Sequence, residues 1–191
     1  CGGRPTRNES SMEMNEVLSY RWDIPNDPDS KMLTPGFSMA TAAYTLTGEY
    51  TKEESSLNTN YSVCRGGARP PAWRTHEENV AAKAEYEGEA QVTVSLEPDS
   101  SFLINGGGPN GQPTGEMVMT QKEDHDDGCN GQDPTRTRTL NGTWRPGSWS
   151  GNIEGKADPN ADELSGSRTT VEKHPGAETT ITHIYSWELH R

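Results

Sequence analysis

Hydrophobic and polar residues alternate with a period of two along much of this chain, which is typical of β-strands with one buried face. In the segment 17–24 the apolar side of the predicted strand carries Leu18, Tyr20, Trp22 and Ile24. The segment 89–97 repeats the pattern with Ala90, Val92, Val94 and Leu96. Both segments therefore predict strands that pack one face against a hydrophobic core.

The last segment of the chain, 180–190, has the clearest alternation. One face carries Ile181, His183, Tyr185, Trp187 and Leu189. Ile184 is the only apolar residue on the other face. Pro175 and Gly176 separate this segment from 168–173 and suit a type II turn, so the two segments are predicted to form a hairpin. Half-buried strands of this kind belong to antiparallel sheets with one solvated side.

Asn-Gly pairs, the strongest short signal for a β-hairpin, begin at Asn105, Asn110, Asn130 and Asn141. Further strands are predicted in the segments 37–50, 57–63, 102–105, 116–121, 136–140 and 151–156. The segment 76–86 is predicted as a short helix, because Thr75 can cap it and acidic residues occupy its first turn. Its Val80 and alanines are equally compatible with a strand.

These elements predict an all-β fold, either an antiparallel β-sandwich or an up-and-down barrel, with about eight to ten short strands and long loops. Only 29% of the 191 residues are hydrophobic, and the chain holds 20 glycines and 13 prolines, so the core should be thin. Five tryptophans and six tyrosines supply enough apolar area for an ordered domain. We expect one domain, residues 16–191, after a flexible tether, residues 1–15.

The N-terminal residues predict a lipid anchor. Cys1 is followed by Gly2, Gly3 and a polar run to Ser11, which resembles the mature terminus of bacterial lipoproteins. The alternatives are a chain cut arbitrarily at a cysteine and a secreted protein whose Cys1 pairs with another chain. No apolar run approaches the roughly 18 residues that a bilayer-spanning segment needs, so the predicted membrane contact is through Cys1 alone.

The other two cysteines, Cys64 and Cys129, are predicted to form a disulfide, as expected in an oxidising compartment. A bridge that closes this loop contributes about 4 kcal/mol. Free buried thiols and a metal site are the alternatives, although neither cysteine has CxxC spacing. Arg65, Arg69 and Arg74 lie near Cys64, and an acidic stretch precedes Cys129, so the bridge predicts ion pairs between the two segments.

The charge balance argues against nucleic acid as a partner, because the formal net charge is −12 and repels phosphate backbones. No cofactor is predicted, with one weak exception. Asp158, Asn160 and Asp162 space side-chain oxygens as calcium loops do, and the acidic stretch 123–133 is a weaker candidate. Both lack the glycine and glutamate of an EF-hand loop, so solvated acidic turns are the alternative.

Three segments partly match a catalytic or nucleotide-binding motif, but none meets the requirements of that motif. The segment 106–111 matches GxGxxG, but Pro109 and the residues after it cannot open the required helix. His76 begins an HExxH pattern in which Val80 replaces the second histidine. Trp149 occupies the place of the nucleophilic serine in a GxSxG-like segment. We therefore assign no catalytic residue, although a triad assembled in space stays open.

The strongest candidate for surface recognition is the segment that holds Trp144, Arg145 and Trp149, which is typical of a loop. Exposed indole rings beside an arginine bind sugar rings and partner side chains. The alternative is that both rings cover the ends of the core.

A second candidate site is the apolar face of the last strand, with His183, Tyr185 and Trp187. In a barrel these side chains would line an interior ligand site. The alternative is a buried, hydrogen-bonded histidine in a filled core.

Together these features predict an exported, lipid-anchored β-domain that binds a protein or glycan partner in the cell envelope or has a structural role there. It would lie in the periplasm or at the cell surface, or be secreted if it has no lipid. A small-ligand carrier and a hydrolase with a spatially assembled site are the alternatives. A closed barrel with a cavity that contains His183 favours the carrier. A histidine within hydrogen-bond reach of a serine and a carboxylate favours the hydrolase, and a filled core with Trp144 and Trp149 outside favours the binding protein.

Overall fold

The computed structural model describes residues 7–24, 36–60, 72–126, 132, 134–147, 151–156, 163–174 and 178–190. In these residues the chain forms nine strands and no helix. The strands are β1 (Arg7–Ile24), β2 (Gly36–Asn60), β3 (Ala72–Leu96), β4 (Ser101–Pro109), β5 (Gly115–Asp126), β6 (Arg136–Trp144), β7 (Gly151–Lys156), β8 (Glu163–His174) and β9 (Glu178–His190). The predicted all-β fold is confirmed.

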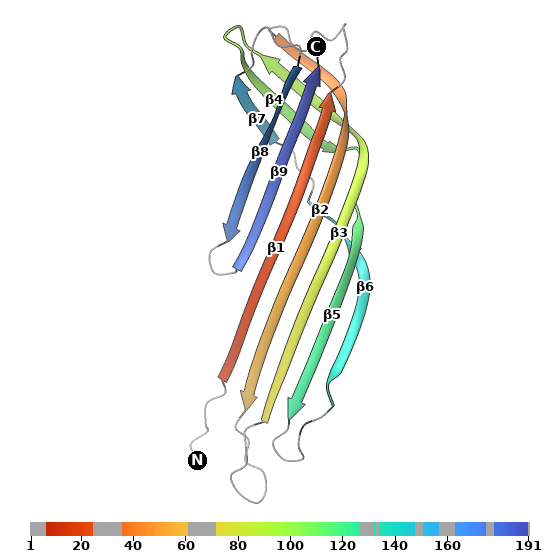
Figure 1. Ribbon diagram of the computed structural model, residues 1–191, viewed down its shortest axis with the longest axis vertical. Helices are drawn as coiled ribbons and strands as arrows, with labels where there is room; N and C mark the ends of the chain where they lie inside the picture. The colour runs from red at the N-terminus through yellow and green to blue at the C-terminus, as the bar shows by residue number, and fades with distance from the viewer. Residues whose placement is uncertain are drawn as a thin grey trace, which may run out of the picture.

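All nine strands belong to one open, mixed sheet, in the order β6-β5-β3-β2-β1-β9-β8, with β4 beside β3 and β7 beside β4 (Figure 1). Every neighbouring pair is antiparallel except β1 and β9, which run parallel. β8 and β9 form the hairpin that the sequence predicts. β2 and β3 have 25 residues each, so the central strands are much longer than the short strands expected.

The sheet has two halves, because the same edge of β3 pairs with β5 along its first part and with β4 along its last part. We call residues 7–16, 49–60 and 72–83, together with β5 and β6, the single-layer half. The rest of β1, β2 and β3, together with β4, β7, β8 and β9, is the core half. Figure 1 shows the single-layer half as one layer of strands that extends away from the core half.

The hydrophobic core lies on one face of the core half, which we call the inner face. Its buried residues are Leu18, Tyr20, Trp22, Ile24, Ala42, Tyr44, Leu46, Ala90, Val92, Val94, Leu96, Phe102, Ile104, Ile153, Tyr185 and Trp187. The alternation predicted for the segments 17–24 and 89–97 is therefore confirmed. The core positions on β1, β2 and β3 are even-numbered, so the even-numbered residues of these strands also define the inner face of the single-layer half.

Two hydrogen bonds across the inner face hold distant segments against β1. The indole Nε1 of Trp22 donates to the carbonyl of Gly107 on β4 at 3.2 Å. The hydroxyl of Tyr20 donates to the carbonyl of Gly147, just after β6, at 3.2 Å. The glycine-rich end of β4 thus packs over an indole ring, which gives the failed GxGxxG match a structural role.

The helix expected in the segment 76–86 is wrong, because this segment lies in the middle of β3. β2 and β5 pair with β3 on its two sides and take up its backbone hydrogen bonds. Its buried positions alternate as Val80, Ala82 and Ala84, which is the period of a strand. Pairing with two neighbours overrides the local helix signals.

The tether expected over residues 1–15 is also corrected, because β1 begins at Arg7. Residues 7–15 pair with residues 51–59 of β2 in a continuous antiparallel register. Their polar side chains gave no sign of a strand, since this part of the sheet has no hydrophobic core to impose alternation. Residues 1–6, which include Cys1, lie outside the described residues.

Candidate recognition surface

The single-layer half carries polar and charged side chains on both faces. Within its described residues, the buried apolar side chains are Val80 and Ala82 of β3, which lie next to the core half. Folding normally draws its stability from apolar burial, so this half depends on its hydrogen-bonded ladders and on continuity with the core half. It forms an extended two-faced surface on hydrogen-bonded strands.

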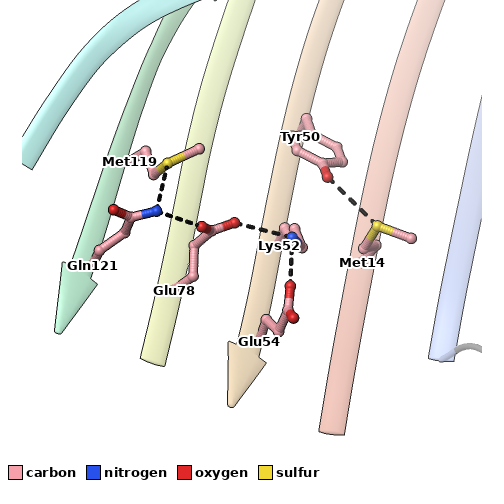
Figure 2. Close-up of polar contacts among 7 residues, drawn as sticks. All are labelled: Met14, Tyr50, Lys52, Glu54, Glu78, Met119 and Gln121. Carbon is pink, nitrogen blue, oxygen red and sulfur yellow. Dashed lines mark hydrogen bonds and ion pairs between the residues drawn. The ribbon is translucent and has the colours of Figure 1, made fainter. Parts of the chain in front are cut away.

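A row of polar contacts crosses the inner face of this half (Figure 2). Lys52 Nζ of β2 lies 3.0 Å from Glu78 Oε1 of β3 and 2.6 Å from Glu54 Oε2. Gln121 Nε2 of β5 donates to Glu78 Oε2 at 2.8 Å. Hydrogen bonds from Gln121 and Lys52 lower the pKa of Glu78, and bonds to Glu54 and Glu78 raise the pKa of Lys52. The row ties β2, β3 and β5 together.

A hollow of about 230 Å³ lies further along the inner face, toward the end of the sheet away from the core, and we call it the basic hollow. It is lined by Arg74 of β3, Glu123 and His125 of β5, Pro134, and Arg136 of β6. The strand registers place Arg74 opposite His125, and Glu123 opposite Arg136. These pairings bring residues from three strands to one place on the same face.

Glu123 binds the basic residues beside it. Its Oε1 lies 3.0 Å from Arg74 Nη2 and 3.6 Å from His76 Nδ1. Arg136 is exposed and has no ion-pair partner among the described residues. The ion pair that the sequence predicts for Arg74 and the acidic stretch is thus present, while Arg65 and Arg69 lie outside the described residues.

In the described part of the acidic stretch 123–133, Glu123 lies apart from Asp124 and Asp126. As β5 is a strand, Glu123 faces the inner side while Asp124 and Asp126 face the other side. Asp124 contacts Lys122 at 3.4 Å and accepts a hydrogen bond from the Thr135 hydroxyl, which lowers the pKa of Asp124. The weaker calcium candidate therefore has its described side chains on opposite faces of the sheet.

Trp144 is the last residue of β6 and packs against the sheet. Its ring stacks on Tyr50 with centroids 6.0 Å apart and covers the backbone of Gly48. Arg145 is exposed, and Trp149 lies outside the described residues. For Trp144 the structure agrees with the alternative interpretation, a ring that covers the edge of the core.

His183, Tyr185 and Trp187 lie on the inner face of β9, as their spacing predicts. Tyr185 and Trp187 are buried in the core, and His183 is half-buried beside them. Tyr185 stacks on Tyr20 with centroids 5.5 Å apart, and His183 stacks against both rings at 6.1 and 5.9 Å. Within the described residues, three buried polar atoms in this region have no hydrogen-bond partner: Tyr44 Oη, His183 Nδ1 and Trp187 Nε1. Such atoms are rare in folded proteins and call for an explanation.

A serine, a histidine and a glutamate also stand in one row across β2, β3 and β5. Ser56 lies opposite His76 in the register, and His76 contacts Glu123 at 3.6 Å. Among the described residues, however, Ser56 makes no hydrogen bond to His76. The continuous ladders around this row use the backbone N–H groups that an oxyanion site would need. The row therefore lacks the geometry of a hydrolase.

Several predicted site residues lie outside the described residues: Cys1, Cys64, Cys129, Asp158, Asn160 and Asp162. In contrast, sequence reasoning missed the basic hollow and the row at Lys52. The signal for the hollow was Arg136 and Arg138, two residues apart in a predicted strand and so on the same face.

Comparisons of this chain with protein-family models, curated proteins and solved structures find no match. No helix long and apolar enough to cross a bilayer is found in the part of the chain that the structure describes.

Proposed function

We propose that this chain is an exported, lipid-anchored binding protein of the cell envelope, and that the single-layer half is its recognition surface. The observation that carries the proposal is the composition of this half, a sheet with polar side chains on both faces and little core. Ordering these residues costs conformational entropy that apolar burial does not offset locally. A surface maintained in this way suits contact with a partner.

The size of the surface fits a protein or glycan partner. Strands spaced about 4.8 Å apart, with a rise of about 3.3 Å per residue, give five strands of about ten residues an area of about 800 Å² per face. A typical specific interface covers about 800 Å² on each partner. One face of the single-layer half is therefore comparable to a complete binding site.

The lipid anchor and the disulfide complete the proposal. Arg7 begins β1 at the end of the single-layer half away from the core, so a lipid on Cys1 would attach the molecule by that end. Trp73 pairs with Asp126, so the segments that contain Cys64 and Cys129 leave adjoining strands at that same end. This topology supports the bridge between them.

Intact mass of the protein from its native host tests the anchor and the bridge. We expect a diacyl or triacyl mass on the N-terminal peptide and no thiol at Cys64 or Cys129 that reacts before reduction. An unmodified Cys1 would contradict the anchor, and two reactive thiols in the native protein would contradict the bridge. Neither result depends on the recognition surface.

Binding of the full chain, with Cys1→Ser to remove the lipid, to envelope fractions of the host tests the recognition surface. Val118→Arg and Leu140→Arg place a charge on opposite faces of the single-layer half. Val171→Arg is the matched control, because Val171 is an exposed valine on β8 in the core half. We expect at least one of the first two variants to weaken binding by about tenfold, equivalent to about 1.4 kcal/mol. Equal binding by all three variants would contradict the proposal.

A second candidate function, a small-ligand carrier, is favoured by the three unpartnered polar atoms at Tyr44, His183 and Trp187. A polar molecule bound among these side chains would satisfy them. Native mass spectrometry of the protein from its host would then detect a released small molecule, and Tyr44→Phe would reduce its yield. A ligand-free mass, together with a Tyr44→Phe variant at least as stable as the parent, would argue against the carrier.

A further inference from the structure

The basic hollow has a charge opposite to that of the molecule as a whole. The chain has a formal net charge of −12. Around the hollow, however, the inner face presents the guanidinium groups of Arg74 and Arg136, and Arg138 lies two residues further along β6. Glu123 is the only carboxylate that lines the hollow among the described residues. A local positive site within an acidic protein is a specific feature of its surface.

The two lining arginines differ in a way that suits an anion. Arg74 is oriented by Glu123, with 3.0 Å between Nη2 and Oε1, and a guanidinium group has five N–H donors, so others stay available. Arg136 has no ion-pair partner in the described part of the chain, so its whole guanidinium group can bind a ligand. His125, which lines the hollow between them, adds a third nitrogen-bearing side chain.

The dimensions fit a tetrahedral oxyanion with part of the molecule that carries it. The hollow measures about 230 Å³, whereas a water molecule in the liquid occupies about 30 Å³. Arg74 and Arg136 lie on strands separated only by β5. Neighbouring strands are about 4.8 Å apart, so the two backbones are about 10 Å apart and their long side chains can approach one group from two sides.

We propose that the basic hollow binds a phosphate group, with Arg74 and Arg136 as its principal ligands and His125 as an additional contact. Arginine matches phosphate geometry with two parallel hydrogen bonds, and Glu123 positions Arg74 for this contact. This inference rests on the proposed function of the single-layer half as a recognition surface and names the chemistry that it recognises. The phosphate belongs either to a soluble molecule or to a lipid headgroup.

The test uses the full chain with Cys1→Ser and measures binding of pyrophosphate by titration calorimetry. Arg136→Gln should weaken binding by about tenfold, equivalent to about 1.4 kcal/mol, because it removes hydrogen bonds from a charged donor to the phosphate. Arg74→Gln should do the same. Arg168→Gln is the matched control, since Arg168 is an exposed arginine on β8 in the core half and should leave binding unchanged. Thermal unfolding of each variant confirms that it folds.

A second measurement separates the two sources of phosphate. Cosedimentation with phosphatidylcholine vesicles that contain phosphatidylglycerol, lost in Arg136→Gln, identifies a lipid headgroup. Pyrophosphate binding without cosedimentation identifies a soluble ligand. No saturable binding of either probe, or equal weakening by Arg168→Gln, overturns the inference. If Val118→Arg or Leu140→Arg still weakens envelope binding in that case, the ligand class is wrong while the recognition surface stands.

Discussion

Glu78 is the residue that joins three strands of the single-layer half. It accepts hydrogen bonds from Gln121 of β5 and Lys52 of β2, and its side chain is only 13% exposed. These bonds, that of Gln121 first, lower the pKa of Glu78 from its usual 4.5. A lowered carboxyl pKa contributes stability above the usual value, and this stability is lost as pH falls through the pKa of the folded state.

We therefore predict that Glu78→Gln lowers the free energy of unfolding at pH 7 by about 1.5–3 kcal/mol, the range for hydrogen bonds to charged groups. The variant should also lose less stability on acidification below pH 4.5 than the parent chain. Urea unfolding at neutral and acidic pH measures both effects. Glu77→Gln is the control, because Glu77 lies on the opposite face of the sheet. Its ion pair with Lys122 is exposed and has a long N–O distance of 3.6 Å. An equal loss in both variants would contradict this role of Glu78.

Glu16 shows the opposite behaviour at the boundary with the core. Burial raises the pKa of Glu16 above its usual 4.5, and the charge of His183 only partly opposes this. The folded protein thus binds this proton more tightly than the unfolded chain, so stability falls as pH rises through the range just above 4.5. We predict that Glu16→Gln removes that fall and raises the free energy of unfolding at pH 7. Denaturant unfolding of the parent chain and the variant between pH 4 and pH 7 measures this difference. If Glu16→Gln leaves the pH dependence of the free energy of unfolding unchanged, Glu16 is not its source.

The elements of the core half meet at positions where only glycine fits. A Cβ atom on Gly106 of β4 would lie 2.9 Å from the indole ring of Trp22, which is 1% exposed and cannot move away. We predict that Gly106→Ala destabilises the fold by about 1–3 kcal/mol, as overpacking of a core does. Gly147→Ala is the control, since no atom lies within 4 Å of its added Cβ. Thermal unfolding should give a lower midpoint temperature for Gly106→Ala than for Gly147→Ala.

The sequence predicted those elements that pack against the core. Leu18, Tyr20 and Trp22 on β1, and the valines of β3, alternate because one face of each strand is buried. The single-layer half has no such signal, since residues 7–15 and their partners on β2 are mostly polar on both faces. Their pairing is specified by the neighbouring strands. The parallel pairing of β1 with β9 joins the two ends of the chain, and no local pattern encodes it.

The candidate site was predictable only in part, for a related reason. The charges near the two cysteines predict ion pairs between these two segments, and Arg74 and Glu123 form such a pair. The basic hollow also needs Arg136, which lies opposite Glu123 only because β5 and β6 pair in one particular register. Likewise, Lys52 and Glu78 lie on strands whose register follows from the whole sheet. A one-residue slip would send each side chain to the other face.

At the scale of the whole molecule, the two halves differ in what stabilises them. The core half has a cluster of buried aromatic and aliphatic side chains. The single-layer half has continuous ladders, the row at Lys52 and the exposed ion pair between Arg74 and Glu123. Exposed ion pairs contribute about 0–1 kcal/mol each. The single-layer half is therefore stabilised mainly by β1, β2 and β3, the strands that continue into the core half.

This difference predicts two steps in hydrogen exchange. Backbone amides in the parts of β5 and β6 remote from the core, residues 120–126 and 136–139, should exchange by local opening at a free energy below that of global unfolding. Amides in 18–24, 42–46 and 90–96 should exchange only on global unfolding, because they lie in the buried core strands. Exchange followed by mass spectrometry in increasing low concentrations of urea distinguishes the two, since local opening exposes little surface and depends weakly on denaturant. A single protection level across all strands, with the same urea dependence, would mean that the two halves unfold as one unit.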